Sequence, residues 1–64
     1  MPYYRVVYAN NVVVSCTEID SLPDNASLDR PFQLEDGKLV FAYVQTDSVA
    51  AAAQKGSELV IQNI

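Results

Sequence analysis

The sequence has no histidine, no tryptophan and a single cysteine, Cys16. Without histidine, the chain lacks the usual general base, the usual nitrogen ligand of zinc and the base of Ser-His and Cys-His nucleophiles. One cysteine can form neither an intrachain disulfide nor a CxxC metal site, which is consistent with a reducing compartment. Because Cys16 follows Val14 and Ser15 in a β-rich run, we interpret it as a small packing residue. We therefore expect a protein without catalytic activity and without a bound metal.

Glycine is equally scarce, with only Gly37 and Gly56 in the chain. The local sequence assigns Gly37 to a turn and Gly56 to the end of a helix. A phosphate-binding loop or a dinucleotide fingerprint needs several closely spaced glycines, and none are left for one. We therefore expect no nucleotide cofactor.

Basic residues number four against eight acidic residues, which gives a net charge of -4. The four are too few and too scattered to follow a nucleic-acid backbone. No stretch approaches the roughly 20 apolar residues of a membrane span, and the N-terminus lacks the pattern of a signal peptide. The sequence therefore predicts neither direct nucleic-acid binding nor a membrane partner, and it favours the cytoplasm, or the host cytoplasm if the protein is viral.

Half of the residues are apolar, which is typical of a folding chain and not of a disordered one. The 64 residues leave room for one domain, over residues 1–64. A domain of this size buries only about 60% of the surface that its unfolded chain exposes. Self-association would add to its small margin of stability.

Two strand candidates, Pro2–Ala9 and Val12–Thr17, flank Asn10 and Asn11. Both strands are rich in Tyr and Val, and asparagine tolerates the positive φ angles of a tight turn. This pattern predicts a first hairpin.

A second pair of strand candidates, Phe32–Glu35 and Lys38–Gln45, flanks Asp36 and Gly37. Asp-Gly is a strong signal for a hairpin turn. Pro31 stands where a strand can begin but not continue. This pattern predicts a second hairpin.

The spacing of the apolar residues changes after the second hairpin, from that of a strand to that of a helix. Thr46 or Asp47 is placed to cap a helix of about eight residues around Ser48–Lys55, with Gly56 as its stop. Glu58–Ile64 then has the pattern of a closing strand, parallel to the strand before the helix. The fold class predicted is α+β, a small mixed or antiparallel sheet in the order ββ-ββ-α-β with one helix on one face.

The strand candidates are apolar on both faces, while one helix can cover only one face. In the second hairpin the small residues Val40, Ala42 and Val44 suit the alanine-rich helix, which leaves the larger alternate residues on the other face. The first strand adds either Tyr4, Val6 and Tyr8 or Tyr3, Val7 and Ala9, because its register cannot be read from sequence. The predicted interface residues are Tyr4, Tyr8, Leu39, Phe41 and Tyr43.

This apolar face needs a cover, since a large exposed apolar patch marks an interface. Either the segment Glu18–Arg30 folds over it, or a second subunit or another partner does. The segment has only three large apolar residues, so we favour a partner. An ordinary role in strand formation remains the alternative for each tyrosine.

Acidic residues concentrate between the two hairpins, where Arg30 is the only basic residue. The candidate acidic loop consists of Glu18, Asp20, Asp24 and Asp29. Their spacing does not match a calcium loop, and the net charge is low for a mimic of nucleic-acid phosphates. The alternatives are a patch for a basic partner or a solvated loop that keeps the chain soluble.

These features favour a small non-catalytic interaction protein, accessory or inhibitory, of the size common among phage proteins. We expect it to act as a homo-oligomer, a dimer in the simplest case, and to bind an unidentified protein partner through the aromatic face or the acidic loop. The alternatives are a structural subunit that assembles with itself and, less favoured, a sensor of a small apolar molecule.

Overall fold

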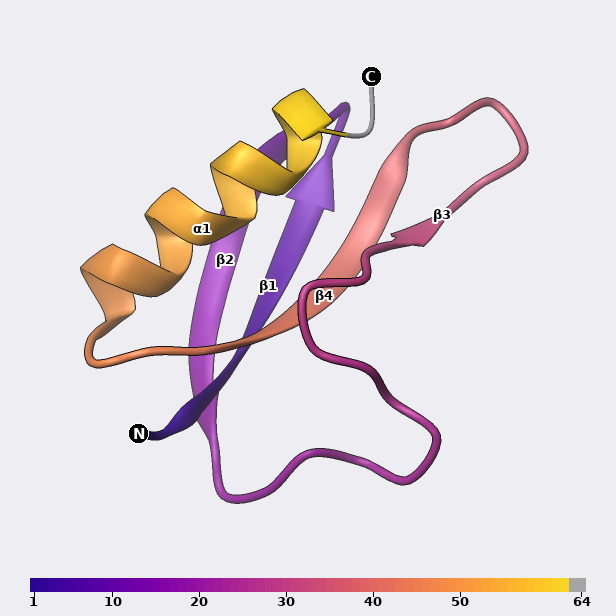
Figure 1. The fold of residues 1–64 in the computed structure, drawn as a ribbon. Coiled ribbons are helices and arrows are strands. Elements are labelled where there is room, and N and C mark those ends of the chain that lie inside the picture. Colours follow the sequence, from indigo (N-terminus) through magenta and orange to yellow (C-terminus); the bar gives the residue numbers. More distant parts are fainter. Residues whose placement is uncertain (63–64) are drawn as a thin grey trace.

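The computed structural model describes residues 1–62 and shows a four-stranded antiparallel sheet with one helix on one face (Figure 1). The strands lie in the order β2-β1-β4-β3. The predicted α+β class, with two hairpins and a helix on one face, is confirmed. The elements are β1 (Tyr3–Ala9), β2 (Val12–Ile19), β3 (Phe32–Gln33), β4 (Leu39–Gln45) and α1 (Val49–Gln62).

Both predicted hairpins are present. Asn10 and Asn11 join β1 to β2 with φ angles of 53° and 61°, the left-handed values that a two-residue turn requires. The turn between β3 and β4 has Gly37 at φ 82°, and its backbone N–H donates to the carbonyl of Leu34 at 2.9 Å. The second hairpin is shorter than predicted because β3 has only two residues.

The closing strand predicted at Glu58–Ile64 is wrong over its described part, because α1 continues through Gly56 to Gln62. Residues 63 and 64 lie outside the described residues. No parallel crossover strand is therefore formed within residues 1–62. The helix cap also differs, since the hydroxyl of Ser48 accepts from the backbone N–H of Ala51 at 3.1 Å, in place of a cap by Thr46 or Asp47.

Gly56 lies inside α1, where the helix contacts β1, and it does not end the helix as predicted. A Cβ atom at this position would lie 2.7 Å from Cγ1 of Val6, closer than side-chain carbons approach one another. The carbonyl of Gly56 accepts a hydrogen bond from the Tyr8 hydroxyl at 2.8 Å. Glycine here lets α1 come close enough to β1 to make this bond.

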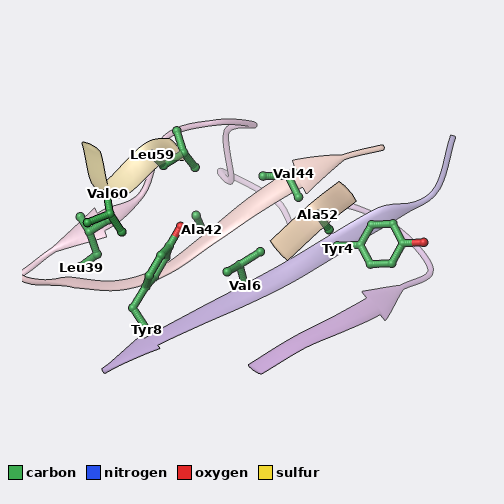
Figure 2. Packing of buried hydrophobic residues seen from close by; sticks show 9 residues of the cluster. All are labelled: Tyr4, Val6, Tyr8, Leu39, Ala42, Val44, Ala52, Leu59 and Val60. Atoms are coloured by element: carbon green, nitrogen blue, oxygen red, sulfur yellow. The ribbon is translucent and has the colours of Figure 1, made fainter. Parts of the chain in front are cut away.

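The hydrophobic core lies between α1 and the sheet (Figure 2). Val6 and Val44 are the largest fully buried side chains, and they come from the two central strands. Burial of each large apolar side chain contributes on the order of 1.5–3 kcal/mol. The core residues are Tyr4, Val6, Tyr8, Leu39, Ala42, Val44, Ala52, Leu59 and Val60.

A shift in strand pairing brings Leu39 into this core. Phe32 is opposite Phe41, but the next residue, Gln33, is opposite Leu39, so β4 has one extra residue at Val40. Because of this extra residue, the side chains of Leu39 and Phe41, on its two sides, point to opposite faces of the sheet. The predicted place of Leu39 on the face without the helix is therefore wrong.

Candidate functional site

The sheet face opposite α1 carries the candidate site. Tyr4, Val6 and Tyr8 point into the core, so the alternate residues of β1 point to the other face. Directly paired residues of neighbouring strands share a face, and the register therefore gives the rest of the set. We call this set the open face: Tyr3, Arg5, Val7, Ser15, Thr17, Ile19, Phe32, Phe41, Tyr43 and Gln45.

Three aromatic rings and one guanidinium group meet at the middle of the open face. The rings of Phe32 and Phe41 are stacked, with centroids 5.3 Å apart and planes 7° apart. Tyr43 meets Phe41 edge to face at 5.7 Å. Cζ of Arg5 lies 5.2 Å from the centroid of Phe41, within the range of a cation–π contact. We call these four residues the aromatic cluster; it joins β1, β3 and β4.

The predicted interface residues separate into two groups. Phe41 and Tyr43 lie together in the aromatic cluster, as predicted. Tyr4, Tyr8 and Leu39 are only 3%, 5% and 3% exposed and lie in the core under α1. Their predicted place on the uncovered face is wrong. For the two tyrosines the reason is that Tyr3 and Val7 of β1 face outward, and for Leu39 it is the extra residue at Val40.

Burial explains the properties of Tyr8. Its hydroxyl donates to the carbonyl of Gly56, and loss of water raises the pKa of Tyr8 to about 12, with a smaller contribution from Cys16. Ionisation of Tyr8 would place a charge next to a carbonyl oxygen in the core. We therefore assign Tyr8 to the attachment of the helix.

Two residues of the aromatic cluster were missed by the sequence interpretation. Arg5 alternates with Tyr4 and Val6 along the strand, so the period of two would have placed it on the open face once those two were assigned to the core. Phe32 directly follows Pro31 at the start of the second hairpin. It is 53% exposed. Its contact with Phe41 depends on the register shift between β3 and β4, which no local feature of the sequence indicates.

A hollow of about 370 Å³ adjoins the aromatic cluster. Its sides are formed largely by residues 23–27, 30 and 31, and this segment lies along the edge of β4 beyond β3. Leu28 bridges to Tyr43, and the backbone N–H of Asp29 donates to the carbonyl of Tyr43 at 2.9 Å. The residues that line it are Pro23, Asp24, Asn25, Ala26, Ser27, Arg30, Pro31, Phe32, Phe41 and Tyr43.

The segment Glu18–Arg30 therefore flanks the open face and does not close it. Phe32 remains 53% exposed beside this segment, and Arg5 is exposed as well. The intramolecular cover considered from the sequence is thus limited to one side of the aromatic cluster.

The four predicted acidic-loop residues do not form one patch. Asp24 lines the hollow, and Asp20 lies at the bend after β2. Glu18 is opposite Tyr4, so it points to the helix face. Asp29 lies in a second hollow, next to Lys55 and Glu58 of α1. Among residues 1–62, no group of three or more His, Cys, Asp or Glu side chains is arranged to hold a metal ion.

Cys16 packs against the core from β2 and is half-buried, in line with its interpretation as a packing residue. Its thiol donates a long hydrogen bond, 3.9 Å, to the carbonyl of Val49 in the first turn of α1. Burial raises the pKa of the Cys16 thiol, which lowers its thiolate fraction at neutral pH.

No protein-family model, curated protein or solved structure matches the chain. In the described part of the chain, no helix has the length and the apolar character that crossing a membrane requires.

Proposed function

We propose that this chain is a small non-catalytic interaction protein that binds a protein partner through the open face, with the aromatic cluster at the centre of the contact. The observation that carries the proposal is the stack of Phe32 and Phe41 with Arg5, on a sheet face that no helix within residues 1–62 covers (Figure 1). Large aromatic residues and arginine are the residue types that contribute most of the binding energy at protein interfaces.

The surroundings of the aromatic cluster support the same proposal. Apolar residues of β1 and β2, Val7 and Ile19, extend the face on one side. Asp24 and Arg30 stand on the other side, around the hollow. An apolar centre with a charged and polar rim is the usual composition of a protein–protein interface.

The proposal includes a cytoplasmic location and an accessory or inhibitory role. The single, half-buried cysteine supports a reducing compartment. An inhibitor or accessory protein needs a binding face and no chemistry of its own, which agrees with a chain that has no histidine.

The test is capture of a partner from a native lysate with wild-type protein as bait and two matched variants. Phe41→Asp places a charge in the aromatic cluster. Ile61→Asp places the same charge on α1, at an apolar residue that is 75% exposed and remote from the open face. We expect the wild type and Ile61→Asp to retain the same partner and Phe41→Asp to lose it. Equal capture by all three baits would contradict the proposal.

A further inference from the structure

The two edges of the sheet differ sharply. At one edge, β3 has two residues and is preceded by Pro31. Farther along this edge, Leu28 forms a single bridge with Tyr43 of β4. At the other edge, β2 has eight residues, Val12–Ile19, and its inner side pairs with β1. Within residues 1–62, no segment pairs with the outer side of β2.

The edge of β2 lacks most of the features that prevent strand pairing. An unpaired edge presents a row of N–H and C=O groups, and proteins protect such edges with lysine and other charges, proline, β-bulges or very short strands. β2 contains no lysine and no proline, and Glu18 is its only charged residue. The pairing with β1 shifts at Val14, but Ser15–Ile19 keeps a regular register.

Exposed apolar side chains gather at this edge. Val12 and Val14 of β2 are each 61% exposed. Val49 is 51% exposed in the first turn of α1, and its carbonyl lies 3.9 Å from the thiol of Cys16 in the middle of β2. The start of α1 also lies beside β2 in Figure 1. The edge therefore combines free backbone groups with apolar surface from both layers.

We propose that the edge of β2 pairs with β2 of a second copy, in antiparallel orientation about a two-fold axis. The two sheets of four strands then join into one sheet of eight strands. Such an axis stands perpendicular to the sheet, so both α1 helices lie on one side and both open faces on the other.

The charge of β2 allows a second copy as the occupant. In every antiparallel register that pairs six or more residues of Val12–Ile19 with the same strand of another copy, Glu18 never lies opposite the other Glu18. Like charges directly opposite one another would destabilise the pair, and none occur. A strand also supplies a regular row of backbone partners for the N–H and C=O groups of the edge, whereas the backbone groups of a helix are already paired within it.

This inference does not depend on the proposed function, because the edge pairs through the backbone of β2, whereas the aromatic cluster consists of residues of β1, β3 and β4. The dimer would present two aromatic clusters on the same side of one sheet. It would therefore bind a repeated or two-fold symmetric partner more tightly than one chain does, by linking two contacts.

The test is the mass in solution, by sedimentation equilibrium from about 10 μM to 1 mM, for four proteins checked for folding by circular dichroism. The variant Val12→Lys/Val14→Lys places two positive charges at the edge, and Val12→Thr/Val14→Thr is its neutral control. Phe41→Asp tests the open face as the alternative interface. We expect dimers of the wild type, the threonine control and Phe41→Asp, and a loss of association of at least tenfold in the lysine variant.

A wild type that stays monomeric to 1 mM overturns the inference, and so does a folded lysine variant that dimerises like the wild type. A dimer lost only in Phe41→Asp assigns the interface to the open face and also overturns it. If the lysine variant is unfolded, mixed labelled and unlabelled wild-type chains decide the question by NMR. Contacts between β2 residues of different chains support the inference, and their absence in a dimer contradicts it.

Discussion

The two faces of the sheet are built from the same strands, and in the middle of β4 they differ in the size of their side chains. Toward α1, β4 presents Ala42 and Val44. The helix has Ala52 in the same core and Gly56 against Val6 of β1, so the two layers come into close contact. On the open face, the same strand presents aromatic rings. Small residues allow one layer to approach another, whereas large aromatic residues offer contact area to a molecule outside the chain.

The largest expected effect comes from placing the same charge on the two faces at adjacent residues. Ala42 is fully buried, so Ala42→Asp places an unpaired carboxylate in the core, at a cost of several kcal/mol. That is comparable with the whole stability of a small domain, roughly 5 kcal/mol or somewhat more. We expect Ala42→Asp to be unfolded by circular dichroism.

The matched change on the open face, Phe41→Asp, should leave the protein folded, because its carboxylate stays in contact with water and lies near Arg5. We expect a loss of about 1 kcal/mol or less in urea unfolding. Equal unfolding by both changes would show that Phe41 belongs to the core.

An effect smaller than that of Ala42→Asp is expected at the contact between helix and sheet. Gly56→Ala adds a methyl group 2.7 Å from Val6 Cγ1, which forces α1 away from β1. We expect a loss of about 1–3 kcal/mol in urea unfolding, although alanine is the better helix former. Ser57→Ala, at the exposed next residue, is the control and should change the free energy of unfolding by less than about 0.5 kcal/mol. A gain of stability in Gly56→Ala would contradict close packing at this point.

Removal of one hydroxyl should cost less again. Tyr8→Phe deletes the hydrogen bond to the carbonyl of Gly56, for an expected loss of about 1 kcal/mol at pH 7. The folded pKa of Tyr8 is raised from 10.0 to about 12, so its contribution is complete below pH 10 and is lost as the pH rises toward 12. We therefore expect wild-type stability to fall more steeply than that of Tyr8→Phe between pH 10 and 12. Parallel curves would exclude a buried Tyr8 hydroxyl.

The smallest effect on stability is expected for Arg5→Ala. Arg5 is exposed, and its cation–π contact with Phe41 contributes about 0.5–1 kcal/mol. Binding of a captured partner, measured by titration calorimetry, should weaken by more than that, because the same contact is desolvated in a complex. Arg5→Lys separates charge from stacking geometry and should recover only part of the affinity. Unchanged binding by Arg5→Ala would remove the guanidinium from the interface.

Local signals in the sequence predict the hairpins well. Asn10 and Asn11 adopt the positive φ angles that their turn requires, and Gly37 does so in the second hairpin. The start of the helix is predicted to within one or two residues, because Ser48 and the alanines after it are local signals too.

Features that depend on contacts distant in sequence are not predicted. Gly56 matches a helix stop, yet its role is set by Val6 and Tyr8, which lie far from it in the chain. Leu59 and Val60 continue the helical period from Ala52, and this weaker signal could have extended the helix.

The aromatic cluster is predictable only in part, for the same reason. Phe41 and Tyr43 share a face by alternation alone. The extra residue at Val40 moves Leu39 to the opposite face, and the register of β1 decides between its two sets of residues. Neither the extra residue nor the register is encoded in one segment, so both require the assembled sheet.

The central claim is that the open face is uncovered in the isolated chain and is closed by a partner. The four tyrosines report on it directly, because Tyr3 and Tyr43 lie on the open face while Tyr4 and Tyr8 are buried under α1. Photochemically induced nuclear polarisation, which detects tyrosine rings accessible to a dye, should enhance Tyr3 and Tyr43 alone in the purified protein, and the signal of Tyr43 should disappear in the partner complex. A silent Tyr43 in the isolated chain, or an unchanged Tyr43 in the complex, would contradict the claim.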